Sequence, residues 1–334
     1  MCPHKLRGRV MTVMSDILPA TAALATSTDI TVMGLAVVPD PSDCYLVCDL
    51  LDHDLEKNVF EALRREVDWG SMNHRGNEVP RLVAVQGEVG KDASIPIYRH
   101  PADNSPPLSP FTATVRQIKE QVEAKLSQPV NHVLIQLYRD GLDAISEHSD
   151  KTIDVVRGSK IVNVSLGAQR TMVLRQKKSA VVHASAALDK DGADSIIGAP
   201  YYRPTVRYPL PHNSMFVLGL ETNRVWLHAI NRDKRPDSEK TLAELSPETS
   251  GARISLTFRH IGTFLSADES LIWGQGAASK DKEHAKPVTP RGPEFRETRI
   301  DLIRAFSAEN QDSEFNWEEG YGAGSDVLHL EGVE

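Results

Sequence analysis

The sequence predicts an α+β fold in which helices pack on one outer side of a sheet sandwich or open barrel. Helical patterns come first, before residue 129, and many short apolar runs broken by turn residues follow them. Helices followed by runs of strands are typical of sheets that carry helices on one face. With 334 residues, of which 40% are hydrophobic, the chain can bury a large core and form one β-rich domain with appendages.

Two segments in the first part of the chain have helical periodicity. Over residues 52–68, apolar side chains recur every three or four positions, as they do on one face of a helix. A second apolar stripe runs over residues 111–126, and Ser109 followed by Pro110 predicts its cap and first turn. We expect both stripes to pack against the core.

Short strands are predicted over most of the chain from residue 129 to residue 265, after an opening apolar segment at residues 31–50. Residues 233–250 are rich in charges and predict a solvent-exposed inserted loop. The predicted strands are Val133–Tyr138, Lys160–Gly167, Thr171–Arg175, Ala180–His183, Ser214–Gly219, Arg224–Ile230 and Arg253–Ile261.

We expect three parts in the chain. Residues 1–30 form a flexible tail, residues 31–265 form the main domain, and residues 266–334 form an extension. The extension has a helical pattern and several aromatic residues, which disordered tails lack, so we expect it to dock on the main domain. Its apolar end, Leu328 to Leu330, can fold back and narrow a pocket.

Composition restricts the classes of protein to consider. Three cysteines form no regular disulfide framework, and no apolar run approaches the ~20 residues that a membrane helix needs. We therefore expect an intracellular protein, cytoplasmic or nuclear, without a membrane segment. The net charge of −8 gives no overall basic surface for nucleic acid, although a local cluster exists at Arg232, Lys234 and Arg235.

The most informative motif is a histidine and an aspartate two positions apart, His148 and Asp150. Residues two apart on a strand project to the same side, so both can point into a cavity with Ser149 outside. Two histidines and one carboxylate can occupy one face of an iron(II) ion and leave its other positions open. His228, in a β-type run, is the candidate for the third ligand. Spacing alone leaves three rivals, His183, His212 and His260.

A strand-like run carries an arginine at each end. Over residues 253–259 the odd positions are polar and the even positions apolar, so Arg253 and Arg259 share a face. Guanidinium groups bind carboxylates through paired hydrogen bonds, so two of them can hold a dicarboxylate such as 2-oxoglutarate. Gln136 and Tyr138 share a face of another strand, and either can hydrogen-bond the bound acid.

The sequence resembles the AlkB-like family of iron(II)/2-oxoglutarate dioxygenases in several motifs, which occur in the same order as in the family. The resemblance covers about residues 55–265, and its motifs are Val79 to Arg81, Leu137 to Gly141, Glu147 to Asp150, Val164 to Gly167, Trp226 to His228, and Arg253 to Arg259. It implies a double-stranded β-helix, or jelly-roll, core with N-terminal helices packed on one sheet. It also implies His148, Asp150 and His228 as catalytic iron ligands. Contacts to 2-oxoglutarate are implied for Tyr138, Arg253 and Arg259, with Arg259 nearer the metal. Gln136 stands where the family usually has asparagine.

The enzyme that this resemblance implies is an oxidoreductase using Fe2+, 2-oxoglutarate and O2, with release of succinate and CO2. As substrate we expect a small molecule, such as an amino acid or specialised metabolite, in preference to nucleic acid. The reasons are the negative net charge and a loop at residues 72–77 without an apolar wedge. The alternative is oxidative demethylation of N-alkylated nucleobases in DNA or RNA. Candidate substrate contacts are Arg81, Gln86 and Tyr98.

Overall fold

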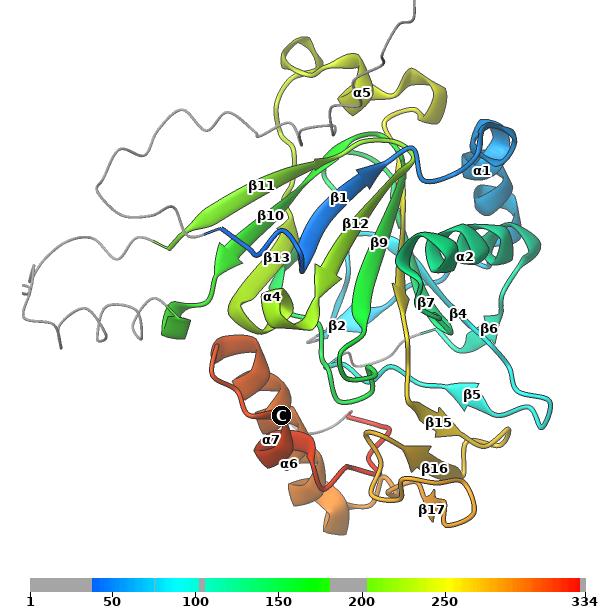
Figure 1. Cartoon of the computed structure of the whole chain (residues 1–334), viewed down its shortest axis with the longest axis vertical. Helices are drawn as coiled ribbons and strands as arrows, with labels where there is room; N and C mark the ends of the chain where they lie inside the picture. The colour runs from blue at the N-terminus through cyan, green and yellow to red at the C-terminus, as the bar shows by residue number, and fades with distance from the viewer. Residues whose placement is uncertain (1–37, 75, 102–105, 181–202, 331–334) are drawn as a thin grey trace, which may run out of the picture. The chain divides into compact units, whose positions relative to one another are not determined.

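The computed structural model describes residues 38–74, 76–101, 106–180 and 203–330 (Figure 1). The tail predicted over residues 1–30 lies outside these ranges, and so does the beginning of the predicted main domain. Among the described residues, no helix is both long enough and apolar enough to cross a membrane.

Two largely antiparallel sheets form the body of the fold. The large sheet has the order β1 (Cys44–Cys48), β12 (Ser214–Gly219), β9 (Lys160–Gly167), β14 (Arg253–Arg259), β7 (His132–Tyr138), β4 (Leu82–Gly87) and β6 (Leu108–Pro110). The small sheet has the order β11 (Thr205–Leu210), β10 (Arg170–Gln176), β13 (Trp226–Ile230) and β8 (Ile145–His148). A short hairpin, β2 (Asn73–His74) with β3 (Asn77–Glu78), stands apart from both.

Helices α1 (His53–Glu66) and α2 (Ala113–Leu126) cover one face of the large sheet (Figure 1). Their apolar stripes, including Leu63 and Ile118, pack against Val164 and Leu256 of the sheet in one core cluster. The other face of the large sheet packs against the small sheet, where Phe216 contacts a cluster that includes Leu174. The predicted jelly-roll core with N-terminal helices on one sheet is confirmed by this arrangement.

Most predicted elements are present, but some boundaries differ. Ser109 and Pro110 do not begin α2, whose N-cap is Thr112, because they belong to β6, the edge strand that pairs with β4. Proline is tolerated there because an edge strand does not require its missing N–H. Arg224 and Val225, predicted to begin a strand, are the last two residues of helix α4 (Leu220–Val225), and β13 begins at Trp226. Ala180 lies in a helical turn, and the rest of the strand predicted at 180–183 lies outside the described residues. The loop predicted at 233–250 contains three short helices, η1 (Asp237–Glu239), α5 (Leu242–Leu245) and η2 (Pro247–Thr249).

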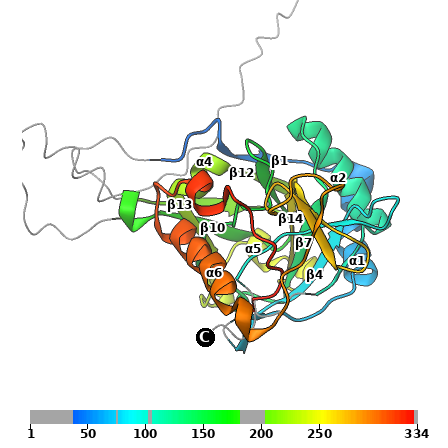
Figure 2. The same ribbon diagram turned by 90° about the horizontal axis from the view of Figure 1, so that it is seen from below.

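A third sheet joins residues from both sides of position 265. It has the order β17 (Lys286–Pro287), β16 (Leu271–Gly274), β15 (Thr263–Leu265) and β5 (Ile95–Pro96). After it come η3 (Pro293–Phe295), α6 (Arg296–Gln311) and α7 (Trp317–Tyr321). Seen from below, α6 crosses the open end of the two main sheets (Figure 2). Phe306 of α6 and Tyr321 of α7 pack in one apolar cluster with Ile153 of the main domain.

Candidate metal centre and its cavity

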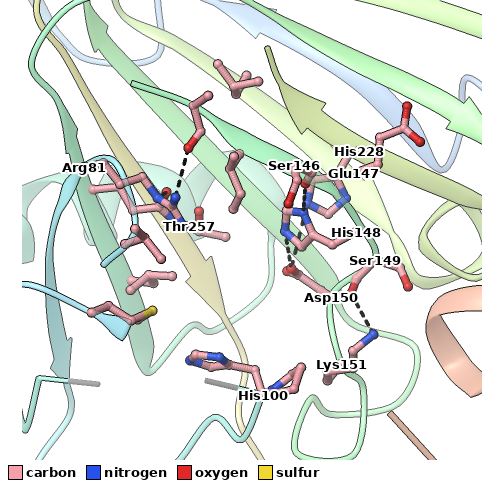
Figure 3. Close-up of a pocket in the computed structure, with 18 of the residues that line it drawn as sticks. Arg81, His100, Ser146, Glu147, His148, Ser149, Asp150, Lys151, His228 and Thr257 are labelled. Atoms are coloured by element: carbon pink, nitrogen blue, oxygen red, sulfur yellow. Dashed lines mark hydrogen bonds and ion pairs between the residues drawn. The ribbon is translucent and has the colours of Figure 1, made fainter. Parts of the chain in front are cut away.

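His148, Asp150 and His228 come together at one end of the small sheet (Figure 3). His148 pairs directly with His228 across β8 and β13, so their side chains lie on the same face. The Nε2 atom of each histidine is 3.8 Å from Asp150 Oδ1. One potential ligand atom from each residue lies within 4.8 Å of the others, so the three side chains fit around one metal ion.

The protonation of His148 and Asp150 suits metal binding. The carbonyl of Ser146 is 2.8 Å from His148 Nδ1, a contact that fixes the proton on Nδ1 and leaves the Nε2 lone pair directed at the site. Burial, together with His228, lowers the pKa of His148 to about 3, so its imidazole is neutral. Burial alone would raise the pKa of Asp150, but Arg259 and the two imidazoles lower it overall, so this carboxyl is ionised.

The polar and the apolar side chains of β14 lie on opposite faces of the strand, as the alternation in its sequence predicts. Ile254, Leu256 and Phe258 belong to the core beneath the helices, whereas Arg253 and Arg259 line the cavity that contains the metal centre. Arg259 Nη2 donates to Asp150 Oδ2 at 2.8 Å. The guanidinium carbon of Arg259 lies 3.8 Å from the centroid of the Tyr98 ring.

Arg253 and Arg259 each leave one donor unused. Their Nη1 atoms are buried and have no hydrogen-bond partner in the described part of the chain. A buried guanidinium without all its partners is costly, so both atoms fit a bound anion at this place. Arg253 is held by its other nitrogens, with Nη2 donating to Ser165 Oγ at 2.6 Å and to Asn163 Oδ1 at 3.0 Å. The two guanidinium groups therefore suit a dicarboxylate such as 2-oxoglutarate.

Gln136 and Tyr138 face the same cavity from the neighbouring strand β7. They lie opposite Ser255 and Arg253 in the register of β7 with β14. Gln136 Oε1 accepts from Tyr138 Oη at 3.0 Å and from Arg81 Nε at 2.8 Å. All of the predicted 2-oxoglutarate contacts thus line one cavity, together with Arg81, a predicted substrate contact.

Only two of the three predicted substrate contacts lie at the cavity. Arg81 and Tyr98 line the cavity, but Gln86 does not. Val83 of β4 lies opposite Gln136 on the cavity face, and Gln86, three residues later, projects from the opposite face. Its side chain is 1% exposed, and Oε1 accepts from the backbone N–H of Thr112 at the start of α2. Gln86 therefore has a place in the packing of α2 on the sheet.

Two of the rival histidines lie away from the metal centre. His212 Nδ1 accepts from the backbone N–H of Gly167, and its Nε2 is 3.7 Å from Glu56. His260 follows β14 and is not among the cavity residues, and His183 lies outside the described residues. Ser149, which we expected outside the cavity, is among its lining residues, is 1% exposed and lies against α6.

Sequence reasoning missed several residues that surround the site. Asn223 Oδ1 accepts from the backbone N–H of Asp150 at 2.8 Å, and its Nδ2 donates to the Asp150 carbonyl at 2.9 Å. No motif around Asn223 indicates this role, which depends on contacts between distant segments. The extension also reaches the cavity, which has a volume of about 1370 Å³. Its contributions to the lining are Ile303, Phe306, Ser307, Asn310, Gln311 and Leu330.

Comparisons with known proteins agree with this geometry. Residues 43–259 match the model of the 2OG-Fe(II) oxygenase superfamily. The chain is 30% identical over 211 residues to the human DNA oxidative demethylase ALKBH2, covering 61% of this chain and 67% of that protein. It is 30% identical over 210 residues to bovine ALKBH2, of which it spans 63%. It is 25% identical over 202 residues to the bovine alpha-ketoglutarate-dependent dioxygenase alkB homolog 3, covering 58% of this chain and 63% of that protein.

The matched residues contain every side chain of the candidate metal centre and of the arginine strand. The family uses Fe2+, 2-oxoglutarate and O2, and the three donors and the two unpartnered guanidinium nitrogens fit these groups. The chain belongs to the 2OG-Fe(II) oxygenase superfamily and is an AlkB-like iron(II)/2-oxoglutarate-dependent dioxygenase.

Proposed function

We propose that this enzyme removes alkyl groups from N-alkylated nucleobases by oxidation, with release of formaldehyde from a methyl group. The observation that carries the proposal is the 30% identity to the DNA oxidative demethylase ALKBH2 across the residues that build the site. The expectation of a small metabolite as substrate has no support from these relatives. The chain spans 63% of bovine ALKBH2, so the substrate is proposed from the site and the shared segment.

We assign the site as follows. His148, Asp150 and His228 would hold the iron through two imidazole nitrogens and one carboxylate oxygen. With 2-oxoglutarate and dioxygen, the bound iron would supply the oxidant that hydroxylates a C–H bond, with release of succinate and CO2.

The two arginines divide the binding of 2-oxoglutarate in this assignment. Arg259, which contacts Asp150, holds the carboxylate near the metal. Arg253, with Tyr138 and Gln136 beside it, holds the far carboxylate.

The size of the cavity supports a substrate larger than an amino acid. Its volume of about 1370 Å³ exceeds the roughly 300–1,000 Å³ of most small-molecule pockets. The cavity includes the positions assigned to the metal and to 2-oxoglutarate, and in this proposal a flipped base takes the space beside them.

The charges near the cavity also bear on a nucleic-acid substrate. Within the cluster predicted from sequence, Arg235 pairs with Asp233 and Glu244, so its charge is neutralised. Arg232 is exposed and lines the cavity, and Arg81 lines it from β4's side. In this proposal Arg232 contacts a phosphate next to the flipped base.

Unpaired nucleotides are the preferred substrate in this proposal. Enzymes that extract a base from a duplex insert an apolar side chain into the stack. The sequence of the hairpin of β2 and β3 beside the cavity, residues 73–78, contains no large apolar residue that could be inserted. The neighbouring Met72 is buried. A single strand needs no such insertion, because its bases are already accessible.

The test uses oligonucleotides that carry one N-methylated adenine or cytosine, in single-stranded and duplex form. The proposal predicts conversion to the unmethylated base, detected by mass spectrometry, together with formaldehyde, and faster conversion of the single strand. Asp150→Ala serves as the inactive control. Absence of repair above uncoupled 2-oxoglutarate decay, with stimulation of that decay by a free amino acid, would overturn the proposal.

A further inference from the structure

The backbone of the segment that follows His148 is held by hydrogen bonds to side chains from other parts of the fold. Strand β8 ends at His148. The next four residues, 149–152, include the proposed ligand Asp150 and belong to no strand. Their consecutive backbone N–H groups each donate to a side-chain oxygen. These bonds are Ser149 to Asn310 Oδ1 at 2.9 Å, Asp150 to Asn223 Oδ1 at 2.8 Å, Lys151 to Tyr98 Oη at 3.1 Å, and Thr152 to Glu309 Oε1 at 3.0 Å.

Two of these four acceptors come from helix α6, which lies beyond the residues that match the superfamily model. Asn310 and Glu309 are consecutive residues in the last turn of α6. Each is itself held in place. Lys151 Nζ donates to Asn310 Oδ1 at 3.3 Å and to the carbonyl of Ser149 at 3.1 Å. The Glu309 carboxylate also accepts from Tyr321 Oη at 2.8 Å.

The helix is fixed against the same segment by packing. Leu302 and Phe306 of α6 are buried against Ile153, which follows the held residues directly. Trp317 of α7 donates from Nε1 to the carbonyl of Thr152 at 3.2 Å. The extension therefore contacts the metal-site segment through both apolar side chains and backbone hydrogen bonds.

We propose that Asn310 and Glu309 are positioning residues for the metal centre, holding the backbone on either side of Asp150 so that its carboxylate faces both histidines. The proposal rests on the ligand assignment made above but not on the class of substrate. Metal sites tolerate deviations of about 0.2 Å in ligand distance, so a loosened backbone at Asp150 weakens binding. Loss of a residue that orients a metal ligand typically lowers metal affinity about 10–100-fold.

The experiment measures Mn2+ affinity of the metal-free full-length chain, by calorimetry or by electron paramagnetic resonance of free Mn2+. Asn310→Ala removes the acceptor for Ser149 and should weaken Mn2+ binding about tenfold or more. Asn310→Asp keeps an oxygen at the same position and should restore the affinity. Arg304→Ala, on the exposed face of the same helix, is the matched control and should bind Mn2+ as the unmodified chain does. Asn310→Ser, whose side chain is too short to reach Ser149, carries the same comparison if Asn310→Ala does not fold.

The variant Asp150→Ala distinguishes a wrong ligand assignment from a wrong positioning role. If Asp150→Ala leaves Mn2+ affinity unchanged, the ligand assignment is wrong and the positioning proposal fails with it. If Asp150→Ala abolishes binding while Asn310→Ala binds as tightly as the unmodified chain, the assignment stands and the positioning role is refuted. A failure of Asn310→Asp to restore the lost affinity would equally refute the role of the Oδ1 acceptor.

Discussion

Arg259 and Asp150 form a buried ion pair at the centre of the site, with Nη2 and Oδ2 2.8 Å apart and side chains 3% and 5% exposed. The same guanidinium leaves its Nη1 atom without a partner in the described chain. Arg259 thus links the proposed metal ligand to the proposed 2-oxoglutarate position. A change at Arg259 should therefore affect the fold, the metal and the co-substrate together.

Arg259→Ala should destabilise the metal-free protein by about 3–5 kcal/mol, because it leaves the Asp150 carboxylate buried without its partner. Urea denaturation measures this loss. The double variant Asp150→Ala, Arg259→Ala should lose less stability than the sum of the two single variants, since neither charge is then left alone. Strictly additive losses would show that the two side chains do not depend on each other.

Arg253→Lys should separate co-substrate binding from metal binding. Lysine cannot make the paired hydrogen bonds of guanidinium, so the KM for 2-oxoglutarate should rise about tenfold or more, roughly 1.4 kcal/mol. Mn2+ affinity should stay unchanged, because Arg253 contacts Asn163 and Ser165 and no metal ligand. A loss of Mn2+ affinity with an unchanged KM would place the dicarboxylate elsewhere.

The stability of the metal-free chain should depend on His148 in acid. The folded pKa of His148, about 3, lies below its unfolded value near 6.5, so the unfolded chain binds more protons between these pH values. The contribution of the neutral imidazole is thus fully present above pH 6.5 and decreases as the pH falls towards 3. Urea denaturation at pH 7.5 and pH 5.0 should show a smaller acid-induced loss for His148→Gln than for the unmodified chain. Equal losses would contradict a buried neutral histidine.

Ser307→Trp should obstruct the cavity from the side of the extension. Ser307 is exposed on α6 and lines the cavity, so a large ring at this position occupies space meant for the substrate. Demethylation of oligonucleotides should fall strongly, while uncoupled 2-oxoglutarate decay should continue, because the arginine strand is untouched. Ser307→Ala is the control and should keep both activities. Equal rates for Ser307→Trp and Ser307→Ala on oligonucleotides would exclude α6 from the substrate path.

Periodicity and local motifs predicted the parts of this structure that depend on neighbouring residues. The alternation of residues 253–259 predicted the polar face of β14, and the spacing of His148 and Asp150 predicted that both side chains face the candidate metal centre. Ser109 and Pro110 were misplaced because their pairing with β4 is a contact between distant segments, which a local cap signal does not reveal.

Residues that act through distant contacts could not be found in this way. Asn223 holds Asp150 across 73 positions, and Asn310 holds Ser149 across 161 positions. Neither has a local pattern that distinguishes it from an ordinary helical asparagine. Gln86 was proposed as a substrate contact from its place after a motif, but the alternation of β4 turns it away from the cavity.

The most direct test of the central claim is the stoichiometry of turnover on a single-stranded oligonucleotide with one N-methylated base. A nucleobase demethylase should form equal amounts of succinate, formaldehyde and restored base, and His148→Ala and Asp150→Ala should lose all three products. Succinate formed at the same rate with methylated and unmethylated oligonucleotides, with no restored base, would contradict it.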